Sequence, residues 1–204
     1  MKQLVLLALS SLLSFAVTAA EVPELAPEGD AAAGEAKSMV CAGCHGADGN
    51  SATGGFPNLA GQHASYIADQ LANFKSKERD NAMMYGFASV LSDQDMLDLA
   101  AFYSAKAPKP GVAQPELAAR GEQVYRFGDP DRGVAACAAC HGPQGKGVAS
   151  AKFPSLAGQW AEYTLTQLNS YKSGARQNAM MNGVAVNMRA ADMEAVASYI
   201  QGLR

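Results

Sequence analysis

Four segments of the chain carry apolar side chains at the three- and four-residue spacing of an amphipathic helix. They are residues 64–76, 92–103, 164–171 and 191–200. In the first of them, Ile67, Leu71 and Phe74 fall on one face. The second begins at Ser92, a good N-cap residue that is followed by an acidic first turn. Strict alternation of apolar and polar residues is nowhere sustained, so the pattern predicts an all-α fold.

The helical segments belong to two copies of one sequence, arranged in tandem. CAGCHG, FPNLAGQ and RDNAMMYG in the first copy return as CAACHG, FPSLAGQ and RQNAMMNG in the second. A repeat of this length indicates two copies of one fold. We therefore predict an N-terminal domain at residues 21–106, a Pro-rich linker at residues 107–116 and a C-terminal domain at residues 117–204.

The first 20 residues have the pattern of a secretory signal peptide. Lys2 supplies a basic start, residues 4–17 are almost entirely apolar, and small residues at 18–20 offer a cleavage site. The apolar run is shorter than the ~20 residues of a membrane-spanning helix, which disfavours an uncleaved anchor. We therefore expect export, which in a bacterium means the periplasm.

Composition and charge exclude two broad classes of protein. The chain has 204 residues, of which 49% are hydrophobic and 17% charged, so it is not an intrinsically disordered chain. A net charge of −3 without a Lys/Arg run argues against nucleic acid as a partner. The charge is uneven: residues 21–106 hold 5 Lys/Arg and 12 Asp/Glu, whereas residues 107–204 hold 10 and 7. Such an asymmetry can orient a charged partner, with Lys152, Lys172 and Arg176 as candidate docking residues.

All four cysteines lie in two Cys-x-x-Cys-His motifs, and this spacing carries the candidate chemistry. The motifs are Cys41-Ala-Gly-Cys44-His45 and Cys137-Ala-Ala-Cys140-His141. Two thiols three positions apart can add to the two vinyl groups of a haem, and the following histidine can then bind the iron. Each copy is too small to build a large apolar core, so a covalently held haem would also stabilise it. The sequence predicts two covalently bound haem c groups, attached at the four cysteines.

Three other uses of the cysteine pairs fit less well. A thioredoxin-like redox site usually accompanies a βαβ pattern, which is missing here. A Cys₄ zinc site needs its pairs about 15–20 residues apart, but Cys44 and Cys137 are much further apart than that. A plain disulfide would not need the histidine that follows each pair.

The remaining histidine and one pair of methionines are better explained by packing than by iron binding. His63 has Trp160 as its counterpart in the second copy, and tryptophan cannot bind iron, so we interpret His63 as a packing or surface residue. Met96 and Met193 fall on the apolar stripe of the last helix of each copy, where methionine normally fills gaps in the core.

Two methionine doublets remain as candidate ligands for the second side of each iron. Both lie in an Asn-Ala-Met-Met-x-Gly segment, which we interpret as a loop. Within the doublets we favour Met84 and Met181, because a glycine two residues later would let the backbone approach the ring. The residues alone leave Met83 and Met180 open as alternatives.

Each copy resembles a class I c-type cytochrome domain, and the tandem resembles the dihaem cytochrome c4 family. The resemblance covers nearly the whole chain after the signal peptide, and it includes both CxxCH motifs, both FPxLAGQ segments and both NAMMxG segments. In such proteins the iron ligands are the CxxCH histidine and a methionine two residues before a glycine. This implies His45 with Met84 and His141 with Met181.

The resemblance also implies a role for the proline of each FPxL segment and a function for the protein. The carbonyl groups of Pro57 and Pro154 are expected to accept a hydrogen bond from Nδ1 of the ligand histidines. An iron bound by both histidine and methionine has no open position for peroxide or O₂, which disfavours a haem peroxidase. We therefore expect an electron-transfer protein rather than an enzyme.

The expected partners are other redox proteins. The family implies a quinol-oxidising complex as donor and a terminal oxidase or reductase as acceptor, and peripheral association with the membrane stays open. The alternative is the dihaem cytochrome subunit of a larger dehydrogenase, such as a sulfide-oxidising flavocytochrome c. A free carrier would purify alone, whereas a subunit would co-purify with a flavoprotein.

Overall fold

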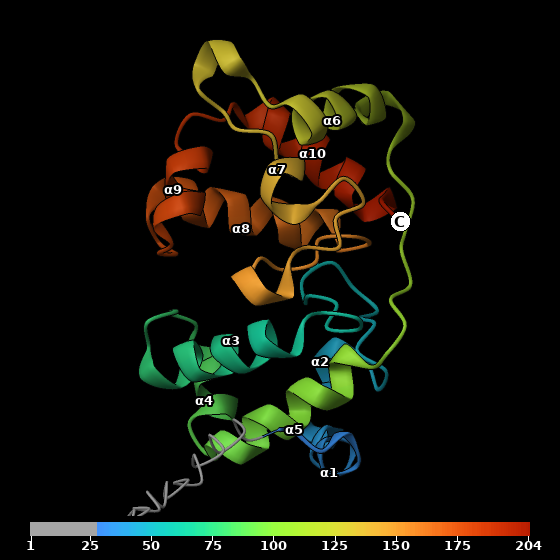
Figure 1. Cartoon of the computed structure of the whole chain (residues 1–204), viewed down its shortest axis with the longest axis vertical. Coiled ribbons are helices and arrows are strands. Elements are labelled where there is room, and N and C mark those ends of the chain that lie inside the picture. Colours follow the sequence, from blue (N-terminus) through green and yellow to red (C-terminus); the bar gives the residue numbers. More distant parts are fainter. Residues whose placement is uncertain (1–27) are drawn as a thin grey trace, which may run out of the picture.

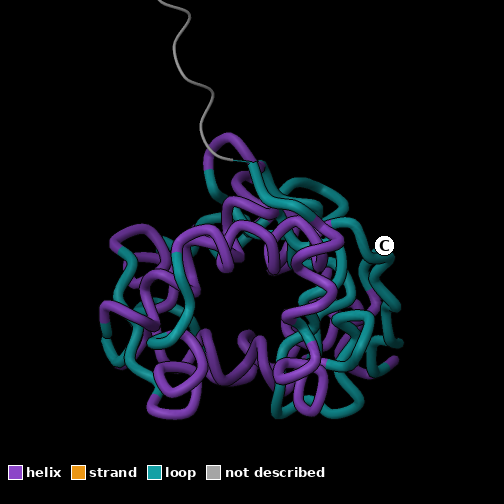
Figure 2. The backbone as a smooth tube through the Cα atoms, turned by 90° about the horizontal axis from the view of Figure 1, so that it is seen from below, coloured by secondary structure: helices purple, strands orange, loops and turns teal. Residues whose placement is uncertain are grey.

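The computed structural model describes residues 28–204, so the predicted signal peptide at residues 1–20 lies outside the described residues. The helices of the N-terminal domain are α1 (Ala31–Lys37), α2 (Met39–His45), α3 (Ala64–Ser76), α4 (Ala82–Ala88) and α5 (Asp93–Ser104). Those of the C-terminal domain are α6 (Pro115–Phe127), α7 (Ala138–His141), α8 (Ala161–Ser173), α9 (Ala179–Ala185) and α10 (Ala190–Gly202), with short 3₁₀ turns η1 (Pro130–Arg132) and η2 (Ala149–Ala151). Within residues 28–204 β-structure is limited to isolated bridges, and Figure 2 shows helices joined by loops. The predicted all-α fold is confirmed.

The helices expected from the apolar pattern are present. α3 has the predicted bounds, and α5 begins directly after Ser92, which shares a capping box with Asp95. α8 and α10 extend beyond the predicted 164–171 and 191–200. Most of the added residues at both ends are small or polar, such as Ala161, Ser173 and Gln201. They add nothing to the apolar stripe, so the pattern alone placed the helix ends too far inward.

The interpretation of the Asn-Ala-Met-Met-x-Gly segments as loops is wrong, because each forms a two-turn helix. Asn81 is the N-cap of α4, and its side-chain oxygen accepts a hydrogen bond of 2.9 Å from the backbone N–H of Met84. Asn178 caps α9 in the same way, with a 3.1 Å bond from the N–H of Met181. An asparagine cap followed by alanine and methionine starts a helix without any apolar periodicity.

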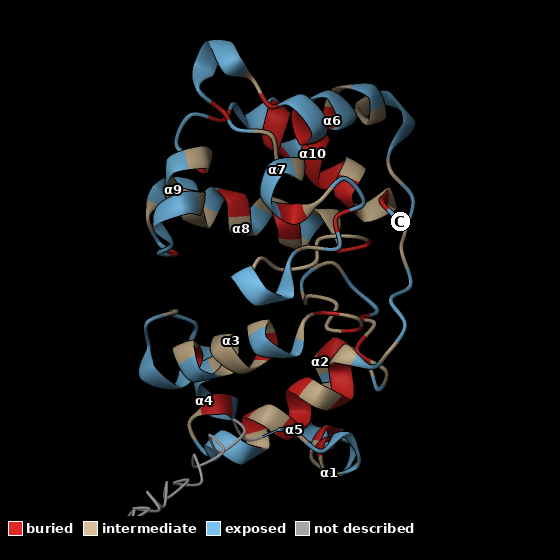
Figure 3. Cartoon of the chain, in the orientation of Figure 1, coloured by how far each residue is buried: buried red, intermediate tan, exposed pale blue. Residues whose placement is uncertain are grey.

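In each domain the first helix crosses the last one at a glycine. α1 packs against α5 in the N-terminal domain, and α6 packs against α10 in the C-terminal domain. A Cβ atom at Gly34 would lie 2.0 Å from the carbonyl oxygen of Asp98, and one at Gly121 would lie 2.2 Å from that of Ala195. Only glycine lets the two helix backbones approach this closely. The crossing places α5 and α10 in the core, and Figure 3 shows buried residues along both.

The two domains lie one above the other along the long axis of the molecule, and an extended linker joins them along one side (Figure 1). Residues 107–114 of this linker have no regular secondary structure. The Lys109 side chain pairs with Asp48 of the N-terminal domain at 2.6 Å. Near the other end of the linker, Gln201 of α10 donates a 3.0 Å hydrogen bond to the carbonyl of Val112. Both domains therefore hold the linker.

The facing loops of the two domains exchange hydrogen bonds in a symmetric pattern. The backbone N–H of Asn58 donates to Gln159 at 2.9 Å, and the Gln159 amide donates back to the Asn58 carbonyl at 3.0 Å. Ser155 and Gln62 form the same pair of bonds, both 2.9 Å long. Ser155 is the repeat equivalent of Asn58, and Gln159 that of Gln62, so the domains meet about an approximate two-fold axis. No helix within residues 28–204 is both long enough and apolar enough to cross a membrane.

Candidate functional site

One cavity of about 1140 Å³ is lined by residues of both domains. Its walls include every residue that the sequence predicts for cofactor attachment or iron binding: Cys41, Cys44, His45, Met84, Cys137, Cys140, His141 and Met181. Cys44 and Met181, for example, lie far apart in the sequence and in different domains, yet both line this cavity. The structure thus brings the predicted site residues together around a volume that could hold a large, mostly apolar group.

The two CxxCH histidines are fixed in one tautomer by a backbone carbonyl. His45 is the last residue of α2, is buried, and its Nδ1–H donates a 2.9 Å hydrogen bond to the carbonyl oxygen of Pro57. His141 at the end of α7 makes the same 2.9 Å bond to Pro154. A carbonyl oxygen can only accept, so Nδ1 carries the proton and Nε2 keeps its lone pair. This confirms the hydrogen bonds implied by the resemblance and leaves Nε2 able to bind a metal.

Burial also keeps these imidazoles neutral. Removal from water lowers the pKa of His45 and of His141, although the bond to the proline carbonyl opposes this shift in each case. A neutral imidazole with a fixed tautomer is the form that binds transition metals. Local packing and the sequence motif therefore point to the same role.

The first cysteine of each motif has the properties of a desolvated thiol rather than of a redox-active one. Burial raises the pKa of the Cys41 thiol, and it raises the pKa of Cys137 to about 11. A thioredoxin-like site requires the opposite shift, because its chemistry depends on a thiolate near neutral pH. Cys41 and Cys44 lie within the short helix α2, so both side chains and His45 project from one structural unit.

The methionine doublets line the cavity, and their two members differ in exposure. Met83 and Met180 are 56% and 58% exposed, whereas Met84 and Met181 are half-buried, and Met181 also packs against the core of the C-terminal domain. The inward position of the second member supports the choice made from the sequence. The choice itself stays a prediction.

The structure does not support the argument that a glycine two residues after Met84 and Met181 is needed for a close approach of the backbone. Gly86 and Gly183 lie inside the helices α4 and α9, and a Cβ atom at either would meet no other atom within 4 Å. Neither has a positive φ angle. No backbone contact therefore requires glycine here, and the hydrogen bond from the helix cap is the feature that positions each second methionine.

The structure confirms the packing role of Met96 and Met193, and it places His63 outside the cavity. Met96 and Met193 are buried in the helices α5 and α10. His63 is half-buried at the start of α3, and its Nε2 atom has no hydrogen-bond partner within residues 28–204. His63 does not belong to the residues lining the cavity, in agreement with its interpretation as a non-ligand.

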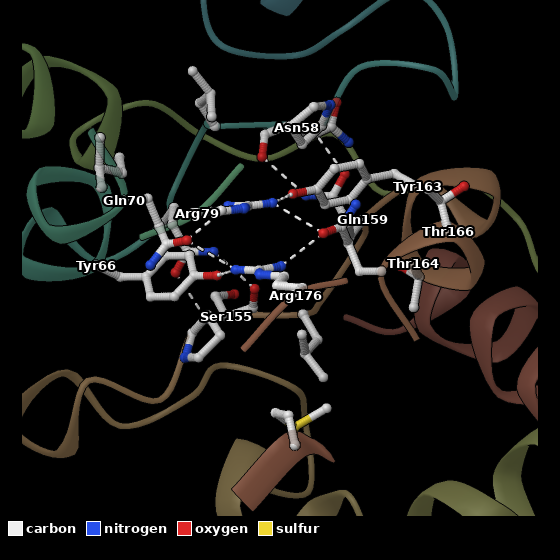
Figure 4. A pocket seen from close by; sticks show the side chains of 18 of the residues that line it. Asn58, Tyr66, Gln70, Arg79, Ser155, Gln159, Tyr163, Thr164, Thr166 and Arg176 are labelled. Carbon is white, nitrogen blue, oxygen red and sulfur yellow. Dashed lines mark hydrogen bonds between the residues drawn. The ribbon is translucent and has the colours of Figure 1, made fainter. Parts of the chain in front are cut away.

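Sequence reasoning missed a group of polar residues at the centre of the cavity wall. Figure 4 shows tyrosine, glutamine and arginine side chains from both domains in hydrogen bonds across the interface. They are Tyr66, Gln70, Arg79, Tyr163, Gln167 and Arg176. The sequence did contain a signal for these residues, because the tyrosine, the glutamine and the arginine each recur at the equivalent position of the second copy. The apolar core of a helix would not require polar residues at these positions.

Comparison with known proteins gives a consistent result. The family model for cytochrome c matches residues 31–104 and again residues 118–204. A cytochrome c4 of Thiocapsa roseopersicina is 47% identical over 180 residues, which cover 86% of this chain and 93% of that protein. The crystal structure of reduced recombinant cytochrome c4 from Pseudomonas stutzeri matches with a TM-score of 0.84 at 43% identity, over 86% of this chain and 100% of that one. A thiosulfate dehydrogenase electron acceptor of Thiomonas intermedia is 39% identical over 83% of this chain and 81% of its own length.

Proposed function

The chain belongs to the cytochrome c family and carries two covalently bound haem c groups, and from this premise we propose that it is a periplasmic electron carrier between respiratory complexes. It is a dihaem electron-transfer cytochrome in the manner of its c4 relatives. Its donor in this proposal is a quinol-oxidising complex, and its acceptor is a terminal oxidase or reductase. The signal-peptide pattern of residues 1–20 supports export.

Each iron in this proposal is bound by two side chains of its own domain. His45 and Met84 are the ligands in the N-terminal domain, and His141 and Met181 are those in the C-terminal domain. The observation that carries the assignment is the fixed tautomer of each histidine, together with a half-buried methionine on the same cavity. When bound, haem supplies a reversible one-electron couple of its iron.

The chain's own residues restrict what this couple can do. Two protein ligands leave no open coordination position for O₂ or peroxide, so the site exchanges electrons rather than activating oxygen. The thioether of methionine favours the ferrous state and raises the reduction potential. The hydrogen bonds from His45 to Pro57 and from His141 to Pro154 hold each imidazole in place and increase its basicity.

The uneven charge supports docking of an acidic partner on the C-terminal domain, but the structure changes which residues could serve. Arg176 is only 9% exposed and lies in the domain interface, so its choice as a docking residue is wrong. Lys152 pairs with Asp69 of the other domain at 2.9 Å. Arg132 and Lys146 are exposed and form no ion pair within the described residues. We therefore assign the docking role to these two residues instead of Arg176.

Electron transfer to an isolated acceptor oxidase, followed by stopped flow at rising ionic strength, tests this function. The rate is expected to fall as salt screens the attraction between the two proteins. Arg132→Gln and Lys146→Gln should weaken the salt dependence, whereas Lys77→Gln on the acidic domain serves as a matched control and should not. A rate that is independent of salt, or equal effects of all three variants, would remove the docking role from the C-terminal domain.

A second function has one observation in its favour. The relative from Thiomonas intermedia bears the name of a thiosulfate dehydrogenase electron acceptor, which suggests a dihaem partner or subunit of a larger dehydrogenase. A sulfide-oxidising flavocytochrome c is the other assembly of this kind that we consider. Purification from the native host separates these functions: a free carrier elutes alone and is reduced by several donors, whereas a subunit co-purifies with its dehydrogenase. The same fractionation reveals any peripheral membrane association.

A further inference from the structure

The cavity between the domains contains two arginines that are bound only by neutral partners. Arg79 follows α3 and Arg176 follows α8, and each is the repeat equivalent of the other. Figure 4 shows both guanidinium groups side by side in the middle of the pocket wall. No ion pair joins either of them to a carboxylate of residues 28–204 within 4.0 Å.

Each arginine binds both domains. Arg79 donates through Nη1 to Gln70 of its own domain at 2.7 Å, and through Nη2 to Tyr163 and Gln167 of the other domain at 2.8 and 3.0 Å. Arg176 repeats the pattern with Gln167 of its own domain at 2.8 Å. Its Nη2 atom donates to Tyr66 and Gln70 of the N-terminal domain, both at 2.9 Å.

Two positive charges are thus held close together in a partly buried site. The Oε1 atom of Gln70 accepts from both guanidinium groups, and so does that of Gln167, so single oxygen atoms separate the two cations. Arg176 is 9% exposed and Arg79 is half-buried. Like charges repel strongly where the effective dielectric constant is low, and amide or phenol oxygens do not neutralise them.

The carboxylates that line the same cavity do not neutralise the positive charges of the two arginines. Asp69 already pairs with Lys152, and the carboxylate of Glu162 lies beside the Gly54 backbone. Glu78 lines the cavity too, but none of the ion pairs within residues 28–204 joins it to either guanidinium. The arrangement therefore fits an anion that is not part of the polypeptide.

Stacking on aromatic rings fixes the orientation of both guanidinium groups. The Arg79 guanidinium lies over the Phe74 ring at 4.6 Å, and that of Arg176 lies over the Tyr171 ring at 4.7 Å. A planar guanidinium held by its face keeps its five N–H donors in fixed directions. The bonds to glutamine and tyrosine use both N–H groups of Nη2 and one of Nη1, so Nε and one N–H of Nη1 remain to donate to a carboxylate. Lysine could not reproduce this geometry.

We propose that Arg79 and Arg176 form one carboxylate-binding site shared by both domains, and that it takes propionate groups of both haems. Each haem is anchored by thioethers at its vinyl groups, and its two propionate carboxylates leave the macrocycle away from those groups. These carboxylates enter the cavity with the cofactor, so the site is filled whenever both haems are attached. The inference rests on the two haems and not on which methionine binds iron.

The crossed hydrogen bonds give this site a specific consequence. Each arginine is bonded into both domains, so its charge acts on both haems rather than on the haem of its own domain alone. A nearby positive charge favours the ferrous state over the more positive ferric state, and its loss lowers the potential. Removal of one arginine should therefore lower two potentials together.

The test is a measurement of both midpoint potentials by spectroelectrochemistry in Arg79→Gln and Arg176→Gln, after mass spectrometry has shown two haems per chain. Each single variant should reduce the ferrous-to-ferric ratio of both haems by about tenfold at fixed applied potential, a shift of about 59 mV for one electron. Arg126→Gln is the matched control, because Arg126 is on the surface and forms an ion pair with Glu122. It should leave both potentials unchanged. A fall in one potential only, or in neither, would overturn the shared site.

A second pair of variants covers the case in which glutamine prevents folding. Arg79→Lys and Arg176→Lys retain the charge but lose the planar fork, so both potentials should fall by less than in the glutamine variants, again together.

Inorganic phosphate, added to the wild-type holoprotein at constant ionic strength, should shift neither potential, because the haem carboxylates already fill the site. A phosphate-dependent shift would assign the site to a free anion and would overturn the proposal.

Discussion

The Nδ1 atom of His45 lies 2.9 Å from the carbonyl oxygen of Pro57, and the copy of this contact between His141 and Pro154 has the same length. A backbone carbonyl thus determines which nitrogen of each imidazole is left able to bind a metal ion. In the proposed histidine–methionine ligand pairs, the methionine is the member that experiment can decide most simply.

Replacement of Met84 or Met181 by alanine is expected to remove one of the two methionine ligands. Half of the methionine-to-iron charge-transfer absorption of the oxidised protein should be lost, and one midpoint potential should fall, because a thioether favours ferrous iron. Met83→Ala and Met180→Ala are the matched controls in the same doublets and should keep the absorption nearly intact. The reverse pattern would make the exposed methionines the ligands.

The helix cap beside each methionine doublet gives a related prediction. Asn81→Ala removes the acceptor for the N–H of Met84 and should destabilise α4 by about 1 kcal/mol. Thermal unfolding should shift to lower temperature, and the charge-transfer absorption of the N-terminal haem should weaken at a lower temperature than in the wild type. Asn169→Ala, on the surface of α8, is the control that leaves both unchanged. An unaltered N-terminal haem in Asn81→Ala would show that the cap does not position the ligand.

The sequence predicted the domains' chemistry better than it predicted the polar contacts around it. The CxxCH motifs and the repeat implied the fold class and the cofactor, because covalent attachment needs a fixed spacing of side chains. α4 and α9 were missed because an asparagine side chain, and not an apolar stripe, starts them. Arg176 was interpreted as a surface residue, since nothing local to it shows that partners about a hundred residues away bury it.

The crossing of α1 and α5 predicts a strong effect of one methyl group. Gly34→Ala would place Cβ 2.0 Å from the Asp98 carbonyl oxygen, where only a separation of the two helices relieves the clash. We expect a loss of about 3 kcal/mol or more in the free energy of unfolding, measured by denaturant titration. Gly43→Ala is the control: its Cβ would meet nothing within 4 Å, and alanine occupies the equivalent position of the second CxxCH motif. Equal stability of the two variants would contradict the role of the crossing.

The same helix pair makes the N-terminal domain sensitive to acid. Lys37 Nζ lies 2.6 Å from Asp98 Oδ2, and this contact holds the pKa of Asp98 at about 2. The ordinary pKa of aspartate in an unfolded chain is about 4, so the contact stabilises the folded state above pH 4 and is lost as the pH falls from about 4 to 2. Circular dichroism during acid titration should show this loss in the wild type. Asp98→Asn should be less stable at pH 7 and should lose less stability across that window, whereas Asp93→Asn on the surface should follow the wild type. An identical acid profile for Asp98→Asn would contradict this assignment.

The mass of the mature, exported protein tests the central claim most directly. Two haems, each held by one CxxCH motif, predict the mass of residues 21–204 plus two haem groups after expression with a working haem-attachment system. Replacement of the histidine and cysteines of one motif should leave one haem. A wild-type mass with one haem or none would contradict the account of a dihaem electron carrier.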